Sequence, residues 1–489
     1  MIIEVYLNND AIPARTSPPR AGMLLREVHT VTDHSVSRRS LFRAAGVGAA
    51  VAGSGILLEA CSSGIQGAAS TPTSSTSSST SGATTSKEIT IGWIHPLTGS
   101  LAGFGYADNW VLQQVMATPQ YKNGIKIGGS TYTVSVKSYD TQSSVTRAGS
   151  LAKQAIEQDN VDLLFASSTP ETVNAVSSEA ETLGTPLICS NIPWESWYIN
   201  LGGNPQKPTL KPKWTVMYFL GAEHLALAFI PMWTRIGAQY GNNHKVAAAF
   251  PNDSDGNAFR AVFPPILSAA GYDINMSAAY TDGLTNYTSM ISQFKNNGDD
   301  FFTNVPLPPD FATMWTQSLQ QGFHPKLATV AKVLLFPTDA YAMGSKVYNI
   351  ATDAWWVPEL PWHSSLTGQT CPELAGLFTS DGLGQPNQNI SNYTLFEIAY
   401  AALTSVNNPH DKTELAASLY QVKLPEAVAG PINYTSSNTK TNPAPGVAIT
   451  PPVGIQWQKG TTYPLEYKVV DNTLQPLAKI TGDLLPTFK

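Results

Sequence analysis

The order of the apolar segments restricts the fold of this chain more than any other feature of its sequence. From residue 88 onward, short apolar or β-branched runs alternate with stretches of about a dozen residues whose apolar positions recur at helical spacing. The runs predict strands at 89–94, 132–140, 161–168 and 185–190, and the stretches between them predict helices at 108–117, 144–159 and 170–184. Strands that alternate with helices of this length form βαβ units, so we predict a parallel sheet with helices on both faces.

The same alternation occurs a second time after an interruption. Residues 200–214 (NLGGNPQKPTLKPKW) are rich in Pro and Gly, and we interpret them as a crossover between two lobes. Beyond them the sequence predicts helices at 222–238, 257–270, 287–296 and 310–321, and strands at 244–250, 272–280, 299–305 and 327–336. We also expect a helix at 391–406 that returns to the first lobe, and a terminal hairpin at 454–471. The predicted fold class is therefore α/β, with two doubly wound parallel-sheet lobes joined by multiple crossovers.

The N-terminal region has the order of parts that is typical of an export signal. Arg38 and Arg39 precede a Gly- and Ala-rich apolar run of about fifteen residues at 44–58, which is short for a membrane span of roughly 20 residues and has the length of a signal-peptide core. The arginine pair resembles a twin-arginine export signal. The sequence LEAC, which ends at Cys61, resembles a lipoprotein cleavage box whose cysteine is lipidated. The alternative is a buried amphipathic helix with a buried cysteine.

These features divide the chain into an N-terminal segment, a tether and two lobes. Residues 62–86 are almost entirely Ser, Thr, Gly and Ala, a composition that cannot bury a core and is typical of a flexible tether. We predict a signal peptide with a lipobox cysteine at 1–61, a tether at 62–87, lobe 1 at 88–218 and 358–449, and lobe 2 at 219–357 and 450–489. We expect an exported cell-envelope lipoprotein, periplasmic or on the outer face of the cytoplasmic membrane and held to the membrane through its lipid alone. Met1 and Met23 are both candidate start sites.

The composition argues against several classes of function. The formal net charge is -6 and only 13% of residues are charged, so no basic face for nucleic acid is predicted. No Gly-x-Ser-x-Gly, His-Glu-x-x-His or Gly-x-x-x-x-Gly-Lys motif is present, and the histidines lack metal-ligand spacing. We therefore expect no cofactor, no metal and a monomeric protein. Cys189 and Cys371 could form a disulfide or remain two buried thiols, and we favour the thiols.

Three segments together resemble a known family. They are IGWIHPLTGSLAGFG, VDLLFASSTPETVNAVSSEAETLGTPLICS and HKVAAAFPNDSDGNAF, in this order and spacing. The chain from Glu88 to about Asp471 resembles the type I substrate-binding proteins of ABC importers, particularly the branched-chain amino acid branch. The resemblance implies the type I periplasmic-binding-protein fold, in which two lobes close over a small ligand, and delivery of that ligand to an ABC permease.

The position of a binding site follows from both the fold and the resemblance. Ligands of open α/β sheets bind beyond the carboxyl ends of the strands, which in the first lobe are residues 98–106, 167–169 and 191–198. In the family the second of these turns binds the ligand's carboxylate, which implies that role for Ser167, Ser168 and Thr169; helix capping is the alternative. Phe104 matches the place of an aromatic ring over the ligand, although a core role is equally compatible.

Other candidate positions depart from the amino-acid-binding pattern. The third segment reads NIPWESWY, so Asn191 and Trp194 stand where the family has small residues and a threonine. In the second lobe Asp253 and Asp255 stand in the acidic turn, and Asp339 lies near the place of the acid that receives an amino group. Trp194 could present a flat face to a ligand or pack in the lobe interface.

The leading hypothesis is a non-enzymatic binding protein for a small organic ligand that is amino-acid-like, an amide or an aromatic acid. A ligand-sensing receptor subunit of the same fold is the first alternative. An exported hydrolase that uses Glu195 in an aromatic cleft is the second.

Overall fold

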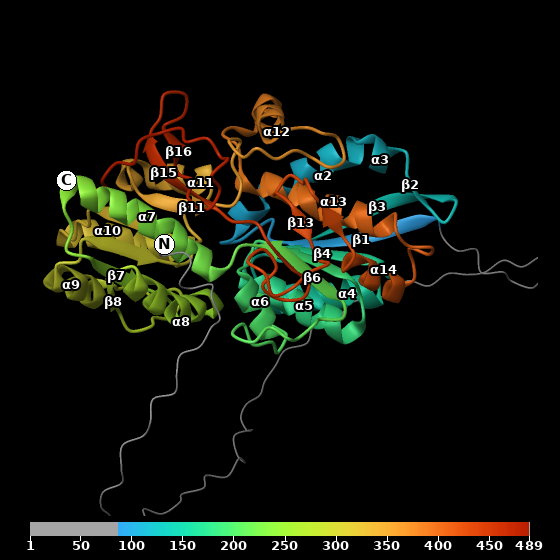
Figure 1. The fold of residues 1–489 in the computed structure, drawn as a ribbon, viewed down its shortest axis with the longest axis horizontal. Helices are drawn as coiled ribbons and strands as arrows, with labels where there is room; N and C mark the ends of the chain where they lie inside the picture. Colours follow the sequence, from blue (N-terminus) through green and yellow to red (C-terminus); the bar gives the residue numbers. More distant parts are fainter. Residues whose placement is uncertain (1–86, 489) are drawn as a thin grey trace, which may run out of the picture. The chain divides into compact units, whose positions relative to one another are not determined.

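The structure, a computed structural model, describes residues 87–488. Two seven-stranded sheets form two lobes within this part of the chain, and a separate two-stranded sheet accompanies them (Figure 1). The predicted export signal, Cys61 and the tether up to residue 86 lie outside the described residues. The fold class predicted from the sequence is confirmed, since both lobes are α/β and built on mainly parallel sheets.

The first sheet has the strand order β14-β6-β5-β4-β1-β3-β2. Its strands are β1 (Glu88–His95), β2 (Ile125–Ile127), β3 (Ser130–Asp140), β4 (Leu163–Ser167), β5 (Leu187–Ser190), β6 (Thr215–Phe219) and β14 (Val447–Ile449). All neighbouring pairs are parallel except β2 with β3, which form an antiparallel edge. Strands β4 and β5 are buried along their whole length, as expected for a parallel sheet covered on both faces.

The second sheet has the order β16-β15-β11-β10-β9-β7-β8. Its strands are β7 (Lys245–Ala249), β8 (Asp273–Met276), β9 (Phe301–Asn304), β10 (Leu327–Val330), β11 (Ala351–Ala354), β15 (Val453–Lys459) and β16 (Leu465–Asp471). The antiparallel pair β15 and β16 is the predicted terminal hairpin, which is confirmed. A small sheet joins β12 (Lys423–Leu424) to β13 (Ile432–Asn433).

The described residues form α-helices between the strands of both sheets. The α-helices of the N-terminal half are α2 (Asp108–Ala117), α3 (Pro119–Lys122), α4 (Val145–Glu157), α5 (Pro170–Leu183), α6 (Trp194–Asn200), α7 (Ala222–Tyr240) and α8 (Ser254–Ala269). Those that follow are α9 (Thr288–Asn297), α10 (Pro308–Gln321), α11 (Pro337–Met343), α12 (Cys371–Phe378), α13 (Tyr393–Leu403) and α14 (Lys412–Leu419).

Helices cover both faces of the first sheet. Figure 1 shows α4 and α5 on one side of this sheet and α2 and α13 on the other. The predicted return of the chain to the first lobe at 391–406 is confirmed by the packing of α13 against β5 and α2.

The chain passes between the two sheets three times, after β6, after β11 and after β14. The crossover predicted at 200–214 was wrong, because this segment joins α6 to β6 and both neighbouring strands, β5 and β6, belong to the first sheet. Its Pro and Gly residues form an irregular surface connection within the first lobe and do not mark a change of lobe. The first passage is the short connection from β6 to α7.

The strand predicted at 327–336 is shorter than expected. β10 ends at Val330, and residues 331–336, which are apolar except for Lys332, continue as a buried irregular segment. Within it Lys332 and Leu334 adopt left-handed φ angles of 67° and 56°. Such a backbone is unfavourable for these side chains and persists only where the surroundings enforce it, often at functional sites.

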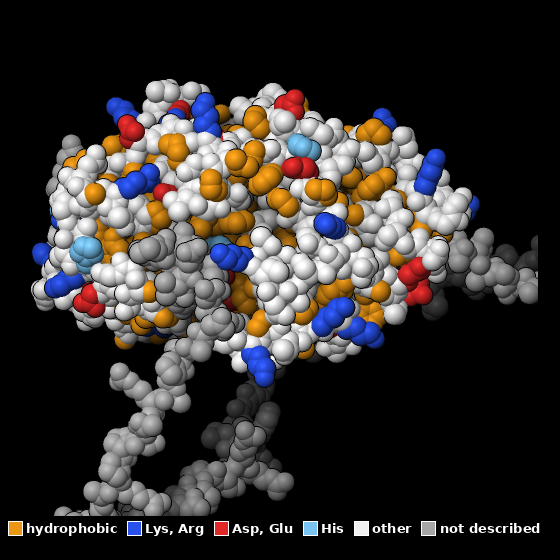
Figure 2. Space-filling model, in the orientation of Figure 1, with side chains coloured by type: hydrophobic (Ala, Val, Ile, Leu, Met, Phe, Trp, Pro, Cys, Tyr) orange, Lys and Arg blue, Asp and Glu red, His pale blue; other side chains and the backbone are white. Residues whose placement is uncertain are grey.

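Cys189 and Cys371 are free and buried, which confirms the preference for two thiols over a disulfide. No helix in residues 87–488 combines the length and the apolar character needed to cross a bilayer. Figure 2 shows basic and acidic side chains scattered over the face that it presents.

Candidate functional site

A cavity that opens to solvent lies where residues from both sheets meet, and about 390 Å³ within and at the mouth of it, open solvent included, is not filled by atoms. It is bounded by segments that follow the carboxyl ends of several strands, including β4, β5, β6, β9, β10 and β11. This is the place at which open α/β sheets bind ligands. The lining residues from the first-lobe segments are Phe104, Thr169, Pro170, Asn191, Pro193 and Phe219. The others are Leu220, Leu225, Asp255, Phe259, Val305, Ala331, Lys332, Leu335, Asp353 and Trp355.

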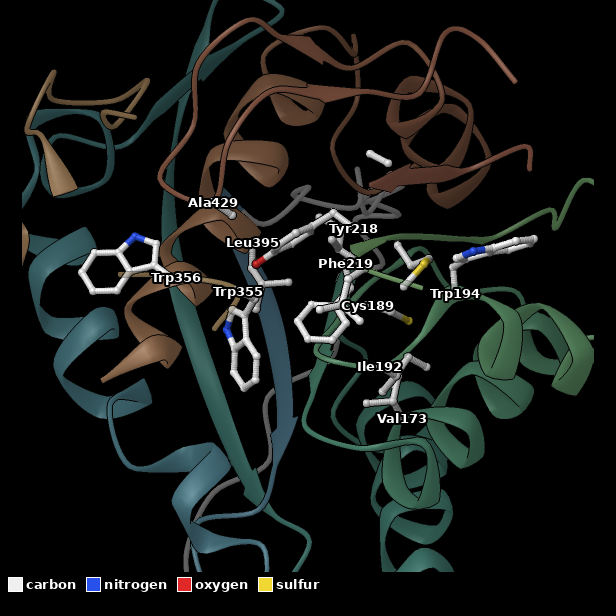
Figure 3. Packing of buried hydrophobic residues seen from close by; sticks show 14 of the residues in the cluster. Val173, Cys189, Ile192, Trp194, Tyr218, Phe219, Trp355, Trp356, Leu395 and Ala429 are labelled. Carbon is white, nitrogen blue, oxygen red and sulfur yellow. The ribbon is translucent and has the colours of Figure 1, made fainter. Parts of the chain in front are cut away.

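Aromatic rings form much of the apolar wall of this cavity. The rings of Phe219 and Trp355 meet edge to face with centroids 5.2 Å apart, and Figure 3 shows them side by side. Phe104 lies parallel to Trp355 with a centroid separation of 6.2 Å, and it also contacts Phe336 edge to face. Trp355 is held in place because its indole Nε1 donates to Ser391 Oγ and its backbone N–H donates to Gln388.

A buried lysine lies at the centre of an ion-pair cluster beside the cavity. The Nζ atom of Lys332 lies 2.7 Å from Glu171, 2.9 Å from Asp255 and 3.4 Å from Asp253. Glu171 is in the first turn of α5 in the first lobe, whereas the other three residues belong to the second lobe. The Lys332–Glu171 pair therefore joins the two lobes directly across the site.

Burial and mutual charge shift the pKa values in this cluster. Although burial opposes it, the carboxylates of Asp255 and Glu171 hold the pKa of Lys332 well above its ordinary value. Burial raises the pKa of Asp255 to about 7 even though Lys332 acts in the opposite direction, since Glu171 and Asp253 add like charge. Lys332 thus remains protonated. Its single positive charge compensates only part of the negative charge of the three carboxyl groups around it.

Asp353 is a further carboxyl group at the cavity, outside the lysine cluster. It is 3% exposed and lies in β11, two residues before Trp355. Burial raises its pKa to about 7. Its contact with Thr352 Oγ1 is long, at 3.5 Å, and that hydroxyl also contacts the Val330 carbonyl oxygen at 2.7 Å. Because a hydroxyl carries a single proton, Asp353 is a poorly compensated acceptor.

Four of the residues predicted from the sequence line the cavity: Phe104, Thr169, Asn191 and Asp255. Thr169 occupies the N-cap position of α5 but makes no side-chain capping hydrogen bond, and its buried Oγ1 has no partner. Asn191, at a left-handed φ of 63°, accepts from Ser190 and donates to Asn392. Asp253 does not line the cavity; it caps α8 through the Gly256 N–H and contacts Lys332.

The other predicted residues lie apart from the cavity lining. Ser167 Oγ accepts from the Trp93 indole, and Ser168 is buried with no partner for its hydroxyl. Trp194 donates to Glu223 and packs against Tyr198, and in Figure 3 its ring lies away from Phe219 and Trp355. Asp339, in α11, is half-buried, and burial raises its pKa to about 6.

Glu195 does not line this cavity. Both of its carboxyl oxygens accept from the Ala222 N–H at the start of α7, at 3.1 Å. Burial, together with the neighbouring Glu223 carboxylate, raises the pKa of Glu195 well above its ordinary value. This carboxyl group therefore ties α6 to the first passage between the lobes and is poorly placed to act on a bound substrate.

Sequence reasoning missed Lys332, Glu171, Asp353, Phe219 and Trp355. Lys332 was concealed within the apolar run LATVAKVLLF, which reads as one continuous strand. The lone charge in that run was the available signal, since a lysine is almost never fully buried unless it is paired. Asp353 lies near the end of β11 and Trp355 follows it directly; no strand was predicted there from the sequence, so the positional rule was not applied to these two residues.

Two α/β lobes that enclose a cavity at the carboxyl ends of their strands define the class of two-lobed binding proteins. The model of one family, described as periplasmic binding protein, matches residues 88–448. The chain belongs to this family. No curated protein matches the sequence. Members of the family are substrate-binding proteins rather than enzymes, and the family's description places them outside the cytoplasm.

Solved structures share the fold at low sequence identity. A leucine binding protein from Thermotoga maritima is 16% identical, with a TM-score of 0.62, over 79% of this chain and 99% of that one. A branched-chain amino acid binding protein from Streptococcus pneumoniae, in complex with isoleucine, is 15% identical, with a TM-score of 0.60, over 78% and 99%. A solute binding protein from Rhodopseudomonas palustris BisB5, in complex with 3,4-dihydroxy benzoic acid, is 16% identical, with a TM-score of 0.59, over 82% and 98%.

Proposed function

We propose that this protein captures a small organic solute between its two lobes and delivers it to an ABC permease. The observation that carries the proposal is the cavity, because its lining comes from both lobes and so a ligand there contacts both. Such a ligand stabilises the closed arrangement only to the extent that it binds that arrangement better than the open one. The known solutes of similar structures, isoleucine and 3,4-dihydroxy benzoic acid, are of a size and kind consistent with this role.

Thermal-shift screening of amino acids, amides, aromatic acids and amines tests the proposal first. A solute that raises the unfolding temperature is then examined by small-angle scattering, where closure reduces the radius of gyration. Thr169→Val is the matched site variant, because it removes an unpartnered buried hydroxyl at the cavity while keeping the side chain's shape. Thr146→Val, on the exposed side of α4, is the control. A chain that binds none of these solutes, or binds one without closing, contradicts the proposal.

We also propose export through the arginine pair and anchoring through Cys61. The support is the order of the arginines, the short apolar run and the cysteine in the sequence. Arg38→Lys with Arg39→Lys should retain the chain in the cytoplasm, and Cys61→Ser should release the exported chain from the membrane fraction. Labelling with a radioactive fatty acid gives an independent readout, since it should be lost in Cys61→Ser and kept in Cys189→Ser. A Cys61→Ser variant that stays in the membrane fraction would contradict anchoring through Cys61.

A further inference from the structure

The charges around the cavity do not balance. Among the lining residues in the described part of the chain, Lys332 is the one basic side chain, and Asp255 and Asp353 are the acidic ones. Lys332 is already engaged with Asp255 and with two further carboxylates, those of Glu171 and Asp253. One ammonium group thus faces three carboxyl groups, and Asp353 adds a fourth at the cavity wall. With all four ionised, this part of the molecule carries a surplus of negative charge.

Two of these carboxyl groups have acceptor capacity that nothing in the protein uses well. The Asp255 side chain is 5% exposed; its Oδ2 faces Lys332, whereas its Oδ1 is buried without a hydrogen-bond partner. Asp353 has the long contact with Thr352, whose proton the Val330 carbonyl also attracts. Buried acceptors without donors are costly and uncommon in native structures. Both carboxyl groups line the cavity, so a donor placed in the cavity can reach them.

The aromatic wall favours the same kind of guest. Phe104 and Phe219 each contact Trp355, and all three rings border the same space as the two carboxyl groups. The faces of such rings attract cations and repel anions, because the π-electron density lies on the face. The rings therefore do not repel an organic cation. Its head can lie near a carboxyl group while its apolar body packs on the rings.

We propose that the cavity takes an organic ammonium ion with an apolar or aromatic body, its cationic head against the Asp353 carboxyl group and its body against the rings. This inference rests on the proposed solute-binding function and names the class of solute. An anionic solute, such as an aromatic carboxylate, would have Lys332 alone as a counter-ion, and Lys332 is already held by three carboxylates. A neutral amide would leave the surplus charge uncompensated.

The test uses a set of probes of similar shape and different charge. Phenethylamine, 3-phenylpropanamide and 3-phenylpropionate are titrated into the purified protein at pH 8 and followed by calorimetry. We expect phenethylamine to bind at least tenfold more tightly than the amide or the carboxylate. Equal or tighter binding of the carboxylate overturns the inference.

Two variants test whether the Asp353 carboxyl group binds the cation. Asp353→Asn should weaken phenethylamine binding at least tenfold and leave binding of the amide within about twofold. Asp299→Asn is the matched control, because Asp299 is also buried in the second lobe with a pKa raised mainly by burial, but it precedes β9 and lies at the opposite end of that strand. Its phenethylamine affinity should stay within about twofold of the wild type. An unchanged affinity in Asp353→Asn overturns the inference.

Lys332→Met tests the sign of the charge that the cavity prefers. Because this variant also removes the Lys332–Glu171 contact between the lobes for every solute, the readout is the affinity for phenethylamine relative to the neutral 3-phenylpropanamide. This ratio should rise when the internal cation is removed, and an unchanged or lower ratio overturns the inference. Circular dichroism verifies that each variant is folded. If phenethylamine fails to bind and an amino acid or aromatic acid binds and closes the lobes, the inference is wrong and the solute-binding function stands. If no member of either panel binds, both are wrong.

Discussion

The ion pair between Lys332 and Glu171 should govern how readily the two lobes separate. Its atoms are 2.7 Å apart and belong to different lobes, and the Lys332 side chain is 4% exposed. When the lobes part, Glu171 becomes hydrated, while Lys332 keeps its contacts with Asp253 and Asp255. The variant Glu171→Gln therefore removes the charged contact across the site without leaving Lys332 uncompensated.

The expected magnitude follows from the chemistry of that one contact. A hydrogen bond between charged groups contributes about 1.5–3 kcal/mol net, and 1.4 kcal/mol corresponds to a factor of ten. Glu171→Gln should thus shift the ligand-free equilibrium toward the open state by about 10- to 150-fold. The gross Coulomb attraction is larger, but hydration of Glu171 in the open state offsets part of it.

Distances between spin labels, one in each lobe, measure this shift. Lys122 and Lys346 are exposed positions suited to cysteine labelling in a background that carries Cys61→Ser, since Cys189 and Cys371 are buried. The closed state should give a shorter interlobe distance and the open state a longer one. We expect the longer distance to gain population in Glu171→Gln. The control is Glu157→Gln, whose carboxylate lies 3.9 Å from Lys153 within α4 and is exposed. If Glu171→Gln and Glu157→Gln give the same distance distribution as the wild type, the ion pair does not hold the lobes together.

Three further predictions concern protons and thiols. Because burial raises the pKa of Asp255 and Asp353 to about 7, acidification from pH 8 to pH 5 should protonate them and weaken phenethylamine binding in calorimetric titrations. Glu195 has a raised pKa in the folded protein, so its stabilising contribution is present at acid pH and lost as the pH rises through that pKa; the melting temperature should fall more steeply with rising pH in the wild type than in Glu195→Gln. Burial raises the pKa of Cys189 and Cys371 to about 12, so a thiol reagent at pH 8 should modify neither residue in the native protein and both after denaturation without reductant.

The sequence was informative about the fold because the alternation of strands and helices is strong in both lobes. Helix α2 runs over Asp108–Ala117 as predicted, and α5 begins at Pro170 as predicted, because a proline is favoured in the first turn. The crossover at 200–214 was misplaced since Pro and Gly indicate an irregular segment but do not indicate which sheet the next strand joins. Only pairing of β6 with β5 decides that question, and pairing is a long-range property.

The site was harder to predict than the fold for a related reason. The rule that ligands bind beyond the carboxyl ends of strands pointed to the segments of Phe104, Thr169 and Asn191, which line the cavity, whereas Asp255, also in the lining, was predicted from the family resemblance. It could not identify Lys332, because hydrophobic patterning continues past the end of β10 while the backbone turns into a left-handed conformation. It also could not tell that Trp194 packs against Tyr198, since a tryptophan that follows the end of a strand is compatible with either role.

The interlobe distance in the presence of a solute tests the central claim most directly. Spin labels at Lys122 and Lys346 are measured without solute and with saturating phenethylamine, leucine or 3,4-dihydroxybenzoate in separate samples. If the cavity is a binding site shared by both lobes, at least one of these solutes should populate a single short distance, and Asp353→Asn should weaken that effect for the amine. A distance distribution that stays the same for every solute that binds would contradict the claim.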